Sequence, residues 1–165
     1  MPLVASLLDK LIDNDPHLRE DKDFPLGQQA LVDNLLRDLE SMLNSRIGWT
    51  EISDDLREVK SSILNYGLPD FSSMPYSSKQ GQDQLCEIVR DAILEFEPRL
   101  ESPNVSILDE KSAVDRTLRL KISATCLIGN NTHEVTFNSE VEPVSLGMKL
   151  ALLRNSMELN QETTI

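Results

Sequence analysis

The sequence contains few of the residues from which active sites and metal centres are usually built. Aromatic residues make up 4% of its 165 residues, with a single tryptophan, and there are two histidines and two cysteines. Such a low aromatic content argues against a sugar-binding cleft. Cys86 and Cys126 lack any CxxC or Cys/His spacing of the kind that holds zinc or an iron centre. We therefore interpret both as buried thiols and expect neither a metal nor a cofactor.

Basic residues and long apolar runs are also scarce. The chain has 16 basic against 28 acidic side chains and a formal charge of −12. This field would repel phosphate backbones and anionic lipids, so we expect no nucleic-acid partner. No apolar run approaches the roughly 20 residues that cross a bilayer, and the N-terminus lacks the order of a secretory signal. We expect a cytoplasmic protein without membrane insertion.

The length and a hydrophobic content of 39% suit one domain with flanking arms. We divide the chain into an N-terminal amphipathic helix and connecting arm (1–27), a folded domain (28–143) and a C-terminal tail (144–165). In the N-terminal helix, the apolar stripe that includes Leu7, Leu8 and Leu11 is too short to be stable alone. These leucines are therefore candidate partner-binding residues.

Hydrophobic periodicity predicts helices in the first part of the domain. Residues 28–46 repeat apolar positions at helical spacing over about five turns. Residues 56–64 suggest a shorter helical piece that ends at a glycine and a proline. A second long helix is predicted for 82–96, with these side chains in the core: Leu85, Ile88, Val89, Ala92, Ile93 and Phe96.

Beyond this helix the apolar period changes from about 3.6 to 2. Residues 114–128 alternate as a half-buried strand, residues 129–132 favour a turn, and residues 135–141 resume the alternation as a returning strand. A third strand is predicted for 104–108. The expected fold class is α+β, with N-terminal helices packed on a small antiparallel β-sheet and a C-terminal hairpin. Such a sheet has two edges.

An enzymatic interpretation would have to use carboxylates. His17 and His133 have no apparent nucleophile or metal partner in the sequence. A glycosidase needs one carboxyl with a raised pKa beside an ionised one, and the best place to seek it is the cluster Asp91, Glu95, Glu97 and Glu101. Asp91 and Glu95 are four positions apart, and this spacing is typical of any solvated helix. We therefore expect no enzyme, no catalytic residue and no metal site.

The tripeptide Glu97-Pro98-Arg99 is more informative. Pro98 lacks an amide donor and disfavours helical geometry at Glu97, so the long helix should end here. One hypothesis is that the two charges form a solvated pair beside a helix stop, which would contribute only about 0 to 1 kcal/mol. Alternatively, Arg99 is a fork held outward for a carboxylate or backbone carbonyls of a partner. Spacing alone does not choose between these hypotheses.

Several stretches resemble a known family. They are SLLDKLIDNDP at 6–16, LVDNLLRDLESMLNSR at 31–46, SILNYGLPDFS at 62–72 and IVRDAILEFEPRL at 88–100, and the hairpin at 117–141 matches in pattern. Together they resemble the TssE family of type VI secretion baseplate subunits, which is similar to a baseplate wedge protein of contractile phage tails. The resemblance ends near residue 143.

The resemblance implies a structural assembly protein whose domain is similar to the interlocking domain of the sheath subunit. Glu97, Pro98 and Arg99 match the family's EPR motif, which implies anchoring to the helical core bundle of the wedge subunits TssF and TssG. Sheath subunits TssB and TssC would add a strand to an open sheet edge, and TssK would be reached indirectly. Residues 65–70 match a further family stretch, mainly a structural turn, in which Asn65 and Tyr66 are candidate contacts.

The expected location is the cytoplasmic baseplate at the inner face of the cell envelope. Two alternatives come from other functional classes. One is a peptidoglycan hydrolase, as an older tail-lysozyme label of the family suggests. The other is a small soluble regulator, because a bacterial anti-adaptor resembles the same domain.

Overall fold

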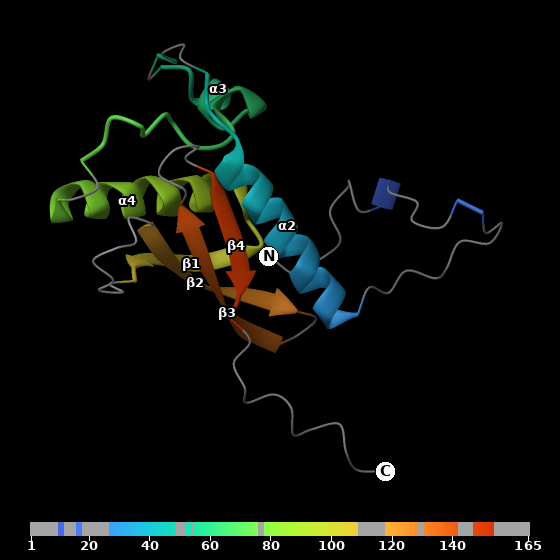
Figure 1. Cartoon of the computed structure of the whole chain (residues 1–165). Helices are drawn as coiled ribbons and strands as arrows, with labels where there is room; N and C mark the ends of the chain where they lie inside the picture. The colour runs from blue at the N-terminus through green and yellow to red at the C-terminus, as the bar shows by residue number, and fades with distance from the viewer. Residues whose placement is uncertain are drawn as a thin grey trace.

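Helices precede strands along the chain. In the computed structural model (Figure 1) the described residues are 10–11, 16–17, 27–48, 52–53, 55–75, 78–108, 118–128, 131–141 and 147–153. The helical elements are α2 (Gln28–Asn44), α3 (Arg57–Lys60), the 3-10 helix η1 (Ile63–Asn65) and α4 (Lys79–Phe96). The strands are β1 (Leu100–Ile107), β2 (Leu118–Ile128), β3 (Asn131–Val141) and β4 (Met148–Leu152). The predicted α+β class is confirmed.

The four strands form one antiparallel sheet in the order β1-β2-β3-β4. Cross-strand partners such as Ile122 and Phe137, or Ala124 and Val135, share one face because side chains alternate along each strand. These four side chains are buried. Helices α2 and α4 pack over this face, with α4 along β1 and α2 along β4 (Figure 1). A single core thus lies between the helices and one side of the sheet.

Strand β4 extends the sheet past residue 143, where the sequence analysis placed the end of the domain. It pairs with β3 from Val141 opposite Met148 to Phe137 opposite Leu152. Met148 and Leu150 are buried. This strand has only five residues, which is too short for its alternation to be distinguished from a weakly apolar tail.

The two long helices lie where the periodicity predicts them. Helix α4 begins three residues earlier than expected, because the Ser78 hydroxyl accepts a hydrogen bond from the Gly81 amide at 3.1 Å and caps the first turn. Leu85, Val89, Ala92 and Ile93 are buried as predicted. Ile88 and Phe96 are only half-buried and pack against the edge of the core.

The predicted helical piece at 56–64 differs from the expectation. It is divided into α3 and η1, which contact each other, and Leu56, Ile63 and Leu64 are exposed. These apolar residues do have helical spacing, but each of the two helices is too short to bury a continuous apolar face against the core. The leucines and isoleucine therefore lie on the surface.

Most of the N-terminal arm lies outside the described residues, and this includes Leu7 and Leu8. Leu11 is described, is helical and is 73% exposed. Within the described ranges, no helix has both the length and the apolarity required to cross a bilayer.

Candidate functional site: a charged turn and two sheet edges

The loop that follows η1 is attached to the end of α2 by backbone hydrogen bonds. Leu68 donates to the carbonyl of Ser45, and Ile47 donates to the carbonyl of Leu68, both at 3.0 Å. Gly67 has a φ of 110°, and a Cβ atom there would lie 2.5 Å from the Ser45 oxygen. Only glycine fits this approach. The stretch at 65–70 is therefore first of all a structural connection.

Asp70 and the apolar residues of the same loop complete this connection. The Asp70 carboxylate accepts the Ser72 amide at 2.9 Å, and this backbone hydrogen bond lowers the pKa of Asp70. Leu68 and Phe71 are fully buried, and the Arg46 guanidinium lies 4.9 Å from the centre of the Phe71 ring. The loop is thus held at both its backbone and its side chains.

Asn65 and Tyr66 connect this loop to its neighbours. The Asn65 side-chain amide donates to the carbonyl of Lys60 at 2.9 Å and so links η1 to α3. The Tyr66 ring packs edge-to-face on Phe96, with 5.4 Å between ring centres and an interplanar angle of 73°. Because Phe96 is the last residue of α4, Tyr66 lies beside the turn that contains Glu97.

The turn at Glu97, Pro98 and Arg99 ends α4 and begins the sheet. The Glu97 amide still bonds to the carbonyl of Ile93 at 2.9 Å, and the Glu97 carbonyl accepts the Leu100 amide at 3.1 Å. Pro98 ends the helix as predicted and is exposed. Glu97, by contrast, is only 6% exposed.

Arg99 binds two carboxylates inside its own domain. Its Nε and Nη2 donate to the two oxygens of Glu97, each at 2.6 Å, and Nη2 also donates to Asp38 of α2 at 2.9 Å. These are short charge-assisted bonds in fork geometry. The hydrogen bond to Glu97, followed by the charges of Glu97 and Asp38, raises the pKa of Arg99 against the opposing effect of burial.

The pKa of Tyr66 depends on the same charged residues. Burial raises the pKa of its phenol, and the negative charges of Glu97 and Asp38 raise it further, while Arg99 lowers it. Tyr66, Glu97 and Arg99, which were predicted separately, thus lie together. Leu11 does not belong to this cluster by any described contact.

Neither hypothesis for the Glu97 and Arg99 charges describes their observed surroundings. The pair is not solvated, because only 8% of the Glu97 and 12% of the Arg99 side chain is exposed. Nor is Arg99 an outward fork, since Asp38 already accepts one of its hydrogen bonds. The sequence analysis missed Asp38 because it lies 61 positions away on another helix, and no local pattern relates it to Arg99. Contact of these residues with a partner stays a prediction.

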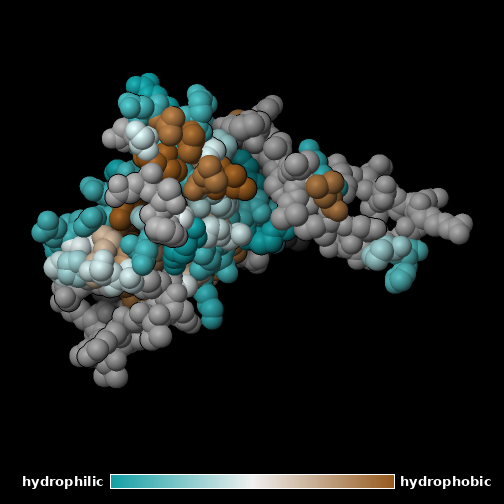
Figure 2. All heavy atoms as spheres, turned by 90° about the horizontal axis from the view of Figure 1, so that it is seen from above, coloured by the Kyte–Doolittle hydropathy of each residue, from teal (hydrophilic) through white to brown (hydrophobic). Residues whose placement is uncertain are grey.

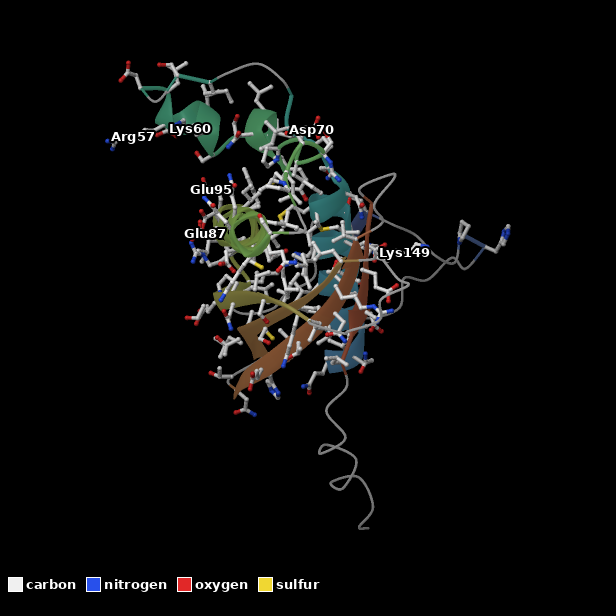
Figure 3. The ribbon with its side chains drawn as sticks, turned by 60° about the vertical axis from the view of Figure 1, so that its left-hand side comes forward. Arg57, Lys60, Asp70, Glu87, Glu95 and Lys149 are labelled. Atoms are coloured by element: carbon white, nitrogen blue, oxygen red, sulfur yellow. The ribbon has the colours of Figure 1, made fainter. Side chains whose placement is uncertain are left out.

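Exposed apolar side chains border this cluster. Ile63 is 86% and Leu64 is 67% exposed, immediately before Asn65 and Tyr66, and Leu56 is also exposed. Figure 2, which views the molecule from the side occupied by α3, shows hydrophobic surface gathered there. In Figure 3 the basic Arg57 and Lys60 extend from α3, on the same side as the acidic Glu87 and Glu95 of α4. The surface is therefore both apolar and charged.

Two carboxylates of the cluster that a hydrolase would need, Asp91 and Glu97, already accept hydrogen bonds from arginines. Asp91 accepts hydrogen bonds from Arg90 at 2.9 and 3.2 Å on the exposed face of α4. Both oxygens of Glu97 are bound by Arg99. Across the described residues, no group of three or more His, Cys, Asp or Glu side chains is arranged to hold a metal ion.

The outer edge of β4 is covered by side chains from α2. The Asn44 amide donates to the Met148 carbonyl at 2.7 Å and accepts the Met148 amide at 2.9 Å. Glu40 accepts the Leu150 amide at 3.0 Å. Three outward-pointing backbone groups of β4 are therefore already bonded.

The outer edge of β1 is different. Its first half is irregular, with a register shift between Glu101 and Asn104 and a φ of 51° at Ser102. Leu108 donates to the carbonyl of Arg119, so by alternation the backbone groups of Val105 and Ile107 point away from β2. No described strand pairs with this side of β1. Among the described residues, 104–107 thus form a short open edge of the sheet.

Comparisons with known proteins give one family and one structural likeness. The model of the family described as baseplate wedge protein gp25 matches residues 29–131. A chain from a structure described as the baseplate complex from the type VI secretion system is similar, with a TM-score of 0.46 and 17% sequence identity. The match covers 69% of this chain and 96% of that one. No curated protein matches the sequence significantly.

Proposed function

We propose that this chain, which belongs to the baseplate wedge protein gp25 family, is the subunit that joins the wedge of a type VI secretion baseplate to its contractile sheath. Family membership is the observation that carries the proposal, because the family model spans both long helices and the first two strands of the sheet. The family is one of structural baseplate components, so the proposed role is assembly and not catalysis. The sequence motifs that resemble TssE favour a secretion system as the setting.

The proposed contact with TssF and TssG lies at the charged turn. Pro98 is exposed there, and Ile63 and Leu64 add apolar surface beside Asn65 and Tyr66. The Arg99 side chain is 12% exposed and would lie at the polar rim of this interface. Glu97 acts by fixing the orientation of Arg99. We propose that the N-terminal stripe of Leu7, Leu8 and Leu11 binds the same wedge complex.

The proposed contact with the sheath lies at the open edge of β1. A strand from TssB or TssC would pair with residues 104–107 through the outward backbone groups of Val105 and Ile107. The first sheath ring would then be templated by backbone hydrogen bonds. In this arrangement the subunit lies in the cytoplasmic baseplate at the inner face of the envelope, and TssK is reached only through the wedge.

The wedge contact is tested by co-purification of TssF and TssG with variants of this chain. Ile63→Asp together with Leu64→Asp should abolish capture while leaving the melting temperature unchanged, because both side chains are already exposed. Leu153→Asp is the matched control, since Leu153 is an exposed leucine at the end of β4. Equal capture of TssF and TssG by the wild type, the double variant and Leu153→Asp would contradict this assignment.

The sheath contact is tested separately by sheath assembly on reconstituted baseplates. Val105→Pro removes an outward amide from β1 and should block sheath growth while sparing TssF and TssG binding. Val105→Thr keeps the amide and the branched shape, and so should assemble normally. Normal sheath growth with Val105→Pro would remove strand addition at β1 from the account.

A further inference from the structure

We propose that Asn44 and Glu40 close the β4 edge against strand pairing, and that without them two copies of this chain join through β4. The inference rests on the proposed function, in which the sheet accepts a sheath strand at β1. The inference adds a physical reason why the β1 edge accepts a sheath strand and the β4 edge does not. The side chains concerned come from α2, which takes no part in the sheet itself.

Asn44 substitutes for a neighbouring strand. One primary amide bonds to both the amide and the carbonyl of Met148, at 2.9 and 2.7 Å. This is the pair of hydrogen bonds that an opposing backbone residue would make in an antiparallel ladder. Asn44 is the last residue of α2, so its side chain can extend beyond the helix end while its Nδ2 also bonds to the carbonyl of Glu40 at 2.8 Å.

Glu40 continues this protection one turn earlier in α2. Its carboxylate accepts the Leu150 amide at 3.0 Å, two residues along β4 from Met148. Four residues along a helix and two residues along a strand both span about 6 to 7 Å. The two side chains therefore follow the outward groups of β4 in register.

The composition of β4 explains the need for such protection. Its five residues, MKLAL, contain one charge, and this Lys149 lies opposite Glu140 of β3. A regular, mainly apolar edge strand of this kind is a template for pairing with another chain. The irregularity of β1 is confined to its first half, where the register shift and Pro103 lie, whereas β4 has no irregularity in its register.

With the β4 edge closed, only the β1 edge of the sheet can pair with a further strand. A sheath strand can then add at β1, and the opposite edge cannot recruit a second strand or a second subunit. If β4 were open, an antiparallel β4-to-β4 contact would be self-complementary and would satisfy two-fold symmetry. The expected product of losing the protection is therefore a dimer of this chain.

Sedimentation velocity over a range of protein concentrations tests the proposal on the full chain. Asn44→Ala combined with Glu40→Ala should shift the protein from monomer to dimer. In the monomer of this variant, the Met148 and Leu150 amides should exchange at least about tenfold faster than in the wild type. Ser41→Ala with Asp33→Ala is the matched control on the same stretch of α2, and should stay monomeric.

A third substitution identifies the edge that pairs. The amide of Leu152 is the next one along β4 that points outward and makes no ladder bond to β3. Leu152→Pro removes this amide, so adding Leu152→Pro to the double alanine variant should restore the monomer. A folded double variant that stays monomeric overturns the proposal, as does one that unfolds without dimerising. Dimerisation that Leu152→Pro fails to reverse also overturns it. Failure of the proposed function is recognised separately, by normal sheath growth with Val105→Pro.

Discussion

Replacing Arg99 by alanine removes a cation that Glu97 and Asp38 share. Three hydrogen bonds of 2.6 to 2.9 Å are lost, and a carboxylate with 8% side-chain exposure is left without its partner. Breaking a buried ion pair costs about 3 to 5 kcal/mol. Because 20% of the Asp38 side chain is exposed and water can reach it, we expect a loss of about 2 to 4 kcal/mol in the free energy of unfolding.

Urea unfolding followed by circular dichroism measures this loss. Arg90→Ala is the matched control, since Arg90 also binds an adjacent carboxylate but with 45% and 66% of the two side chains exposed. That pair should contribute no more than about 1 kcal/mol. A cycle with Arg99→Ala, Asp38→Ala and the double variant should give a coupling of about 1 to 3 kcal/mol. If Arg99→Ala unfolds at the same urea concentration as Arg90→Ala, the internal role of this cluster is refuted.

Three further perturbations test other parts of the structure. Gly67→Ala should cost about 2 kcal/mol or more, because it strains a φ of 110° and meets the Ser45 oxygen, whereas Gly48→Ala, with open space around it, should change the urea midpoint little. Ser139→Ala should be neutral or stabilise by about 1 kcal/mol in thermal melts, since the buried hydroxyl has no hydrogen-bond partner among the described residues; a large loss would show that it has one. The raised pKa of Tyr66 means that the unfolded chain, with its ordinary value of 10.0, loses the phenol proton first, so stability should be full below pH 10 and fall as the pH rises through the folded pKa. Tyr66→Phe should remove this alkaline loss in urea titrations; an unchanged pH profile would contradict it.

The sequence predicts the layers of the fold well because the periodicity of the long elements is strong. Helices α2 and α4 and the hairpin of β2 and β3 each bury one continuous stripe, so the period alone identifies them. The short elements are less well predicted. Residues 56–64 have helical spacing without burial, and β4 is ordered by pairing with β3 and by side chains of α2, which no local pattern reveals.

Some residues of the charged turn could be named from the sequence, but their arrangement could not. Pro98 stops the helix as its chemistry requires, and Tyr66, Glu97 and Arg99 lie together. Their orientation depends on Asp38, a contact between residues 61 positions apart. A long-range ion pair of this kind changes an outward-facing motif into an internal one, and a single sequence carries no signal for it.

Hydrogen–deuterium exchange of the full chain, alone and with TssF and TssG, tests the central proposal most directly. The account predicts slower exchange at residues 63–66 and around Arg99 on wedge binding, with residues 104–107 unchanged until TssB and TssC are added. Protection that is absent, or confined to the outer face of α2, would contradict it.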